Sequence, residues 1–223
     1  MTIVDANLFA ILAAWLVYFA LHSALASLAV KRWASVRWPC LMPTYRIGFN
    51  IIAGVGVLPI LWLLYSHPGP VLWAWTGAWA YLSGGLALAA VVGFLLSLRD
   101  YDLSEFLGLR QWRNQTHGVE DQERFHLSVF HRYVRHPWYF FALVILWTRD
   151  MSAAMLATVL IMTAYFIIGS KLEERKLIAY HGERYRRYME KVAGLLPLPW
   201  KTLSRDEADA LISDEDRTSN SLS

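Results

Sequence analysis

The chain of 223 residues has 56% hydrophobic and 17% charged residues, with a net charge of +3. A soluble domain usually has about 25% charged residues, so this chain is too apolar to be an ordinary one. No charged residue occurs over 7–30 or over 47–98, and a membrane-spanning helix needs about 20 apolar residues. A single cysteine, Cys40, excludes an internal disulfide and a cysteine-based zinc cluster. We expect an integral membrane protein surrounded by lipids, with no nucleic-acid partner.

Apolar stretches predict about five transmembrane helices in chain order. The first residues carry no basic segment of the kind that opens a cleaved signal peptide. The fourth stretch is short, since its ten residues span only about 15 Å as a helix. The fourth and fifth together predict a helical hairpin. The predicted membrane helices cover 8–30, 46–65, 71–98, 138–147 and 151–169.

The remaining segments are polar and complete an all-α, polytopic helix bundle. A charged amphipathic helix begins at Lys171, and Pro197 ends it. We predict a three-helix transmembrane region over 1–98, a cofactor-binding catalytic region over 99–200, and a disordered acidic tail over 201–223.

Basic residues predict the orientation of the chain. Lys and Arg gather after the first, third and fifth predicted helices, and the other two connections carry only Arg149. The positive-inside rule therefore predicts an N-terminus outside the cell and a cytosolic C-terminus.

A polar motif precedes the predicted hairpin, Arg-His-Pro-Trp-Tyr over 135–139. Its simplest interpretation is an interfacial anchor, in which Arg135 reaches the headgroups, Pro137 opens a helix and the aromatic rings mark the membrane surface. Histidines at 126, 131 and 136 are spaced poorly for one helical face, so we expect no shared metal site.

Adjacent acids follow the predicted hairpin. Glu173 and Glu174 come directly after apolar residues, where carboxylates are costly unless they are solvated, paired or functional. An intrahelical pair of Glu173 with Lys176 is the simpler interpretation. Downstream, Tyr185 and Tyr188 predict an aromatic edge that shields a polar ligand or packs the amphipathic helix on the membrane surface.

The hairpin brings these two elements together. Both of its ends return to the same side of the membrane, so residues 135–139 and the pair Glu173–Glu174 become neighbours. We therefore predict a polar pocket with charges of both signs beside an apolar wall.

The combined pattern resembles the isoprenylcysteine carboxyl methyltransferase superfamily of membrane methyltransferases. The similarity lies between residues 125 and 199, and segments 21–27, 45–50 and 108–111 resemble its bacterial branch, which includes methanethiol S-methyltransferases and NnrU-like membrane proteins. Two positions depart from the family pattern, with Phe141 in place of a glycine and His131 in place of a tyrosine. The motifs are Arg135-His136-Pro137-Trp138-Tyr139, Glu173-Glu174-Arg175 and Gly182-Glu183-Arg184-Tyr185-Arg186-Arg187-Tyr188.

The resemblance implies that S-adenosylmethionine binds in a cytosol-facing pocket, at the inner membrane if the source is bacterial. The acceptor is then a small thiol or a lipophilic, isoprenylcysteine-like molecule, and a nearby cation favours the thiolate. His22, inside the first predicted helix, is a further candidate for contact with the acceptor. The implied catalytic residues are Arg135, His136 and Glu174, and the implied cofactor-binding residues are His131, His136, Pro137, Trp138, Tyr139, Glu173, Glu174 and Tyr185.

Two other functions stay open. A membrane reductase of related fold would bind NADPH, although the sequence has no recognisable clamp for a 2′-phosphate and no room for a Rossmann domain. A non-enzymatic, NnrU-like protein is favoured by Phe141. The oligomeric state is not predicted.

Overall fold

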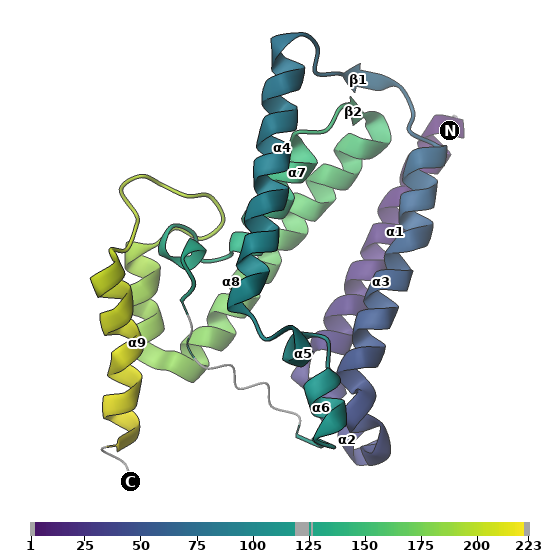
Figure 1. Ribbon diagram of the computed structural model, residues 1–223. Helices are drawn as coiled ribbons and strands as arrows, with labels where there is room; N and C mark the ends of the chain where they lie inside the picture. Colours follow the sequence, from purple (N-terminus) through teal and green to yellow (C-terminus); the bar gives the residue numbers. More distant parts are fainter. Residues whose placement is uncertain (1–2, 119–124, 126, 221–223) are drawn as a thin grey trace. The chain divides into compact units, whose positions relative to one another are not determined.

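A computed structural model describes residues 3–118, 125 and 127–220 (Figure 1). The described residues are mostly helical, and their one sheet has two short strands. They form two compact units: one draws on Met1–Ser83, Tyr101–Asp121 and Arg149–Met162, the other on Gly84–Asp100, Gln122–Thr148 and Thr163–Ser223. The predicted division of the chain into a transmembrane region over 1–98 and a catalytic region over 99–200 is a division by function, and it stays a prediction.

Four helices among the described residues are long and apolar enough to cross a membrane, and they confirm a polytopic helical membrane protein. Only 11% of the apolar window of the second is buried inside the molecule, as expected for a helix that faces lipid. The fifth expected crossing, α7 (Pro137–Trp147), has 11 residues and a length of about 16 Å. The four are α1 (Ile3–Ala26), α3 (Met42–Ser66), α4 (Ala78–Ser97) and α8 (Ala153–Lys191).

In the first unit, α1 and α3 pack side by side (Figure 1). Tyr18 donates a hydrogen bond to the carbonyl oxygen of Ala53 over 3.2 Å, and Trp15 donates to Thr158 of α8 over 3.2 Å. The helix predicted over 8–30 breaks at Ser27, whose hydroxyl accepts a bond from the amide of Val30 and caps α2 (Leu28–Arg37).

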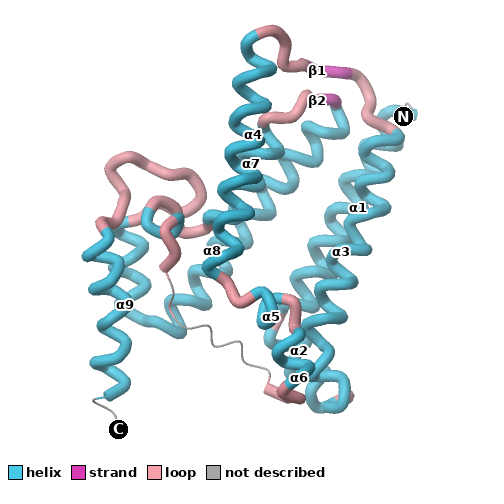
Figure 2. Tube along the Cα trace, in the orientation of Figure 1, coloured by secondary structure: helices cyan, strands magenta, loops and turns pink. Residues whose placement is uncertain are grey.

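Proline carbonyls organise the turn after α3. The expected helix over 71–98 starts only at Ala78, because residues 71–73 form strand β1 (Val71–Trp73), antiparallel to β2 (Met151–Ser152) (Figure 2). The carbonyls of Pro68 and Pro70 accept bonds from the amides of Ala154 and Ala153. These long-range pairings replace the first helical turns that the apolar sequence predicts.

Short helices fill the polar stretch that follows. A 3₁₀ turn over Leu98–Asp100 precedes α5 (Leu103–Phe106) and α6 (Leu109–Arg113). Gly108 has φ +86°, and a Cβ there would lie 2.9 Å from the backbone nitrogen of Ile47. Glycine is therefore required where α6 approaches α3.

The apolar helix and the charged helix expected after it are continuous in α8 as far as a kink, and the residues of α8 from Thr163 onward belong to the second unit. The helix bends at Gly182, whose φ is +55° and ψ is −131°. A 3₁₀ turn over Phe130–Arg132 leads toward α7.

The acidic tail is helical, so its prediction as disordered is wrong for α9 (Arg205–Asn220). Ser204 and Glu207 exchange backbone and side-chain bonds of 2.9 and 3.2 Å, which is a capping box. The apolar side chains Leu203 and Leu211 are buried against Tyr188 in one core cluster. The burial of these apolar side chains offsets the conformational entropy lost when the segment becomes ordered. The acidic composition of the segment does not reveal this contribution. Residues 221–223 of the predicted tail lie outside the described residues.

Candidate functional site

Backbone hydrogen bonds hold the polar motif against the end of α8. Val134 pairs with Ala193 in a parallel bridge. The amide of Arg135 donates to Ala193 over 2.8 Å, and that of His136 donates to Gly194 over 3.1 Å. The motif is thus anchored by main chain, whatever its side chains do.

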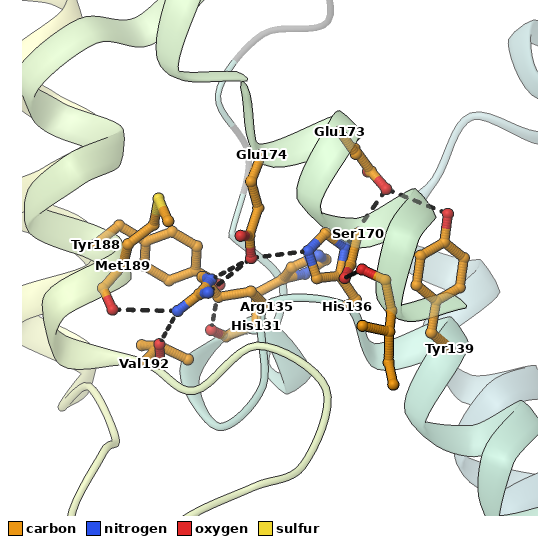
Figure 3. A network of polar contacts seen from close by, with 11 residues as sticks. His131, Arg135, His136, Tyr139, Ser170, Glu173, Glu174, Tyr188, Met189 and Val192 are labelled. Atoms are coloured by element: carbon orange, nitrogen blue, oxygen red, sulfur yellow. Dashed lines mark hydrogen bonds and ion pairs between the residues drawn. The ribbon is translucent and has the colours of Figure 1, made fainter. Parts of the chain in front are cut away.

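Arg135 donates hydrogen bonds to several acceptors inside the protein (Figure 3). Its Nε and Nη2 donate to Oε1 of Glu174 over 2.8 and 2.6 Å. Its Nη1 donates to the carbonyls of Met189, over 3.1 Å, and Val192. The two charged side chains are only 12% and 11% exposed. Arg135 therefore ties Glu174 to the last turn of α8, where helix carbonyls lack partners.

His136 lies between the two acids. Its Nε2 is 3.1 Å from Oε1 of Glu174, and its Nδ1 is 3.4 Å from Oε2 of Glu173. Burial lowers the pKa of His136, but hydrogen bonds and charge from Glu173 and Glu174 raise it by more, so this pKa lies above 6.5. With a carboxylate facing each ring nitrogen, the site favours the imidazolium.

A stack of rings extends the network along α8. Tyr139 lies parallel between His136 and Phe166, with ring centroids 5.4 and 4.8 Å apart and interplanar angles of 11°. The hydroxyl of Tyr139 donates to Oε2 of Glu173 over 3.3 Å. Phe166 was not anticipated, although it precedes Glu173 by two helical turns and so shares its face.

The two adjacent acids have different surroundings. Oε1 of Glu174 accepts from both Arg135 and His136, and the residue is 9% exposed. The side chain of Glu173 is 47% exposed. The network thus presents Glu173 and the hydroxyl of Tyr139 outward and keeps Glu174 inside.

Gly194 makes room for the inner ion pair. A Cβ at this position would lie 3.3 Å from Nη2 of Arg135 and 3.8 Å from Oε1 of Glu174. Nothing in the local sequence around Gly194 identifies it, because the approach depends on a residue far away in the chain.

Trp138 and Pro137 open α7 beside the network, and the side chain of Trp138 contacts α4. The indole of Trp138 donates to Ser97 of α4 over 2.9 Å, and its ring meets Phe94 edge-on at 5.5 Å. Pro137 is buried as the first residue of α7. Trp138 thus links α7 to α4, and the predicted contacts of both residues with a cofactor stay predictions.

Tyr185 and His131 also serve the packing of the unit. Tyr185 is 3% exposed and meets Phe125 and Tyr188 edge-on. Nδ1 of His131 accepts from the amide of Ser128 over 3.3 Å, and its carbonyl accepts from the hydroxyl of Tyr188 over 2.7 Å. Their predicted contacts with a cofactor stay predictions.

Phe141, a departure from the family pattern, points away from the acids. It follows Tyr139 by two residues and so lies on the far side of α7. Its ring is buried, meets Phe130 edge-on at 5.2 Å, and would lie 2.6 Å from a Cβ at Gly93. Phe141 therefore fills a helix contact and does not obstruct the network.

Other candidates lie outside this network. His22 belongs to the first unit, between the rings of Tyr18 and Phe49 at 5.8 and 5.0 Å, and its role stays a prediction. His126 lies outside the described residues. Within the described part of the chain, no group of three or more His, Cys, Asp or Glu side chains is arranged to hold a metal ion.

Comparison with known proteins finds relatives over most of the chain. The chain is 29% identical over 202 residues to a methanethiol S-methyltransferase of Pseudomonas sp. (strain GM41(2012)), covering 84% of this chain and 72% of the relative. It is 31% identical over 180 residues to methanethiol S-methyltransferase 2 of Bradyrhizobium diazoefficiens, covering 79% and 68%. It is 31% identical over 186 residues to a methanethiol S-methyltransferase of Pseudomonas deceptionensis, covering 79% and 67%. No family model matches the chain, and no solved structure matches it.

Proposed function

The chain belongs to the methanethiol S-methyltransferase family. From this premise we propose that this membrane methyltransferase takes its methyl group from S-adenosylmethionine and transfers it to a small thiol. The observation that carries the proposal is the outward-facing pair of Glu173 and Tyr139, held on a buried frame of Arg135, His136 and Glu174.

The outward pair suits the polar groups of the proposed methyl donor. S-adenosylmethionine carries an ammonium and ribose hydroxyls, which need acceptors, and it supplies a methyl group on a positively charged sulfur. The carboxylate of Glu173 is half-exposed and accepts a charge-assisted bond from such an ammonium. The hydroxyl of Tyr139 adds a second polar contact beside it. We assign these two residues direct contact with the donor.

The buried frame keeps the outward pair in place. Glu174, expected from its motif to meet the cofactor, acts in our proposal through Arg135 and His136, since its Oε1 already accepts from both. His136 holds the ring of Tyr139 by stacking and the carboxylate of Glu173 by charge. Arg135, His136 and Glu174 are then positioning residues.

In the proposed reaction, the main contribution of the protein is to align the methyl donor with the thiol acceptor. The nucleophile would be the thiolate sulfur, which would form a bond to the methyl carbon as the methyl–sulfonium bond breaks, so that the rest of the donor leaves as a neutral thioether. Holding donor and acceptor in line contributes several kcal/mol without any acid or base acting on the carbon. A small thiol, rather than an isoprenylcysteine-like molecule, agrees with the names of the relatives.

We propose that the basic ends of the spans face the cytosol, with the N-terminus outside. The support is the clustering of Lys31, Arg32 and Arg37 after α1 and of Arg99, Arg110 and Arg113 after α4, which the positive-inside rule assigns to the inner face.

Calorimetry on the purified chain tests donor binding. We expect S-adenosylmethionine to bind and NADPH not to bind, and Glu173→Gln to weaken binding by about tenfold through loss of one charge-assisted bond. Glu183→Gln, on the same helix and 75% exposed, is the matched control and keeps wild-type affinity. Binding of NADPH instead would indicate a reductase, and no binding of either by folded protein would indicate a non-enzymatic role.

A methylation assay tests the acceptor. Methanethiol, longer alkyl thiols and an S-prenylcysteine are compared at equal concentration with labelled donor. We expect the smallest thiol to be methylated with the highest kcat/KM. A preference for the prenylated compound would overturn the assignment of a small thiol while leaving the donor intact.

A further inference from the structure

The connection between α8 and α9 contains a segment that the proposed reaction does not use (Figure 2). Residues 195–200 read Leu-Leu-Pro-Leu-Pro-Trp and carry no charge, whereas α9 and the adjoining part of α8 are rich in charged residues. Connections on a water-facing surface are usually polar, so this composition indicates a different environment. We call residues 195–200 the apolar loop.

The apolar loop holds large side chains away from the body of the protein. Leu196 is 61% exposed and Trp200 is 76% exposed, and the two prolines between them are exposed as well. A contiguous exposed apolar surface marks a site of contact with another protein or with a membrane. The composition of the loop therefore does not serve the packing of the protein interior alone.

Hydrogen bonds clamp both ends of the apolar loop to the polar motif and to the turn before it. On the entry side, the amide of His136 donates to the carbonyl of Gly194 over 3.1 Å. On the exit side, the amide of Leu203 donates to the carbonyl of Arg132 over 2.9 Å, and Nε of Arg132 donates to the carbonyl of Leu203 over 3.0 Å. Both ends of the loop are thus fixed to one short segment, residues 132–136.

A tight turn and two prolines fix the shape of the loop itself. The amide of Lys201 donates to the carbonyl of Leu198 over 2.9 Å, which closes a four-residue turn with Pro199 and Trp200 at its centre. Proline is favoured at the first of these central positions. Proline also has no backbone N–H, so the loop carries fewer donors that would need a partner away from water.

The segment that clamps the apolar loop lies where membrane-spanning sequence ends. Pro137 follows it directly and opens α7, whose sequence contains no charged residue. Trp138 donates to Ser97, close to the end of the candidate span Ala78–Asp100. The loop therefore leaves the protein at the level where apolar helices give way to polar sequence. That level is the membrane–water interface, for which tryptophan is typical.

The exposure, the clamp and the level of the apolar loop together identify its partner as the lipid bilayer. We propose that the apolar loop inserts into the interfacial region of the membrane, with Leu196 toward the acyl chains and the indole N–H of Trp200 among the headgroups. Because the ends of the loop bond to Arg132 and His136, its insertion holds the polar network at the membrane surface. This insertion does not depend on which methyl donor or acceptor the protein uses.

Spin labelling of the full chain in lipid nanodiscs measures the depth of the apolar loop. The native cysteine is removed by Cys40→Ser, and a nitroxide is attached after Leu196→Cys or Trp200→Cys. Collisions of the nitroxide with oxygen, which dissolves in lipid, and with a water-soluble nickel complex report its depth. We expect both labels to lie about 5–10 Å into the boundary between headgroups and acyl chains. The matched control, Glu183→Cys, replaces a side chain of α8 that is 75% exposed, and its label is expected to lie in water.

Two results would overturn the proposal. Labels at 196 and 200 that collide mainly with the nickel complex would place the loop in water. Labels that collide with neither reagent would place the loop against protein, such as a second copy of the chain. Thermal unfolding establishes that the labelled variants are folded.

If the labelled variants do not fold, the wild-type chain is illuminated in nanodiscs whose lipid carries a photoactivatable group on its acyl chain. We expect crosslinks within residues 195–200 and none within residues 183–187. The absence of crosslinks from residues 195–200 would contradict insertion of the loop.

Discussion

In the first unit, α1 and α3 are linked by single hydrogen bonds, such as that from Tyr18 to the carbonyl of Ala53. In the second unit, by contrast, Arg135 and His136 both bond to the same carboxylate oxygen of Glu174. The helix pair needs little polar support, because its outer surface meets lipid and its backbone satisfies itself. In the network several charged groups are buried away from water, so its stability depends on each charged group keeping its partner. The same kind of substitution is therefore expected to have very different effects in the two regions.

The largest effect is expected at Glu174. Glu174→Leu leaves Arg135 and His136 without their shared acceptor, and breaking a buried ion pair from one side costs about 3–5 kcal/mol. Thermal or denaturant unfolding in detergent measures the loss. Glu173→Leu, one residue away and 47% exposed, is the control and is expected to cost much less. Equal losses in the two variants would show that Glu174 is not the inner member of the pair.

A smaller effect is expected where α4 meets α7. Gly93→Ala places a methyl group 2.6 Å from the ring of Phe141, and overpacking of this kind costs about 1–3 kcal/mol. Gly84→Ala, on the same helix with nothing within 4 Å, is the control and is expected to be neutral or stabilising. Combining Gly93→Ala with Phe141→Leu should restore much of the stability, and failure to do so would contradict the contact.

The charge of His136 predicts a dependence of stability on pH. Because its pKa is raised in the folded chain, the imidazolium contributes stability that is fully present below about pH 6.5 and is lost as pH rises through the raised value. The facing groups are Arg135, Tyr139, Glu173 and Glu174. Unfolding temperature measured from pH 5.5 to pH 8.5 should fall more steeply for the wild type than for His136→Gln. Parallel curves would mean that His136 is neutral in the folded chain.

The smallest effect is expected in the helix pair. Tyr18→Phe removes the hydrogen bond to Ala53 and should cost about 0.6 kcal/mol, the average for such bonds in membrane helices. Tyr65→Phe, at a position that is 71% exposed, is the control. A loss comparable to that of Glu174→Leu would remove the contrast between the two regions.

Composition and charge-free stretches were enough to predict a polytopic helical membrane protein, because the cost of an unsatisfied backbone in hydrocarbon leaves few alternatives. The hairpin argument also predicted that residues 135–139 meet Glu173 and Glu174, and the hydrogen bonds from Arg135, His136 and Tyr139 confirm this proximity. Two ends of a hairpin must return to the same side of a membrane, so this much follows from chain order alone.

Long-range packing decided the rest. Glu173 and Glu174 are chemically identical neighbours in the sequence, but they differ by about 100° around the helix axis, so only the surrounding elements determine which one is buried. The stacking of Phe166, the space at Gly93 for Phe141, and the packing of α9 through Leu203 and Leu211 likewise depend on residues far away in the chain. Local sequence specifies which side chains are available, and the free energy of bringing distant ones together specifies which of them meet.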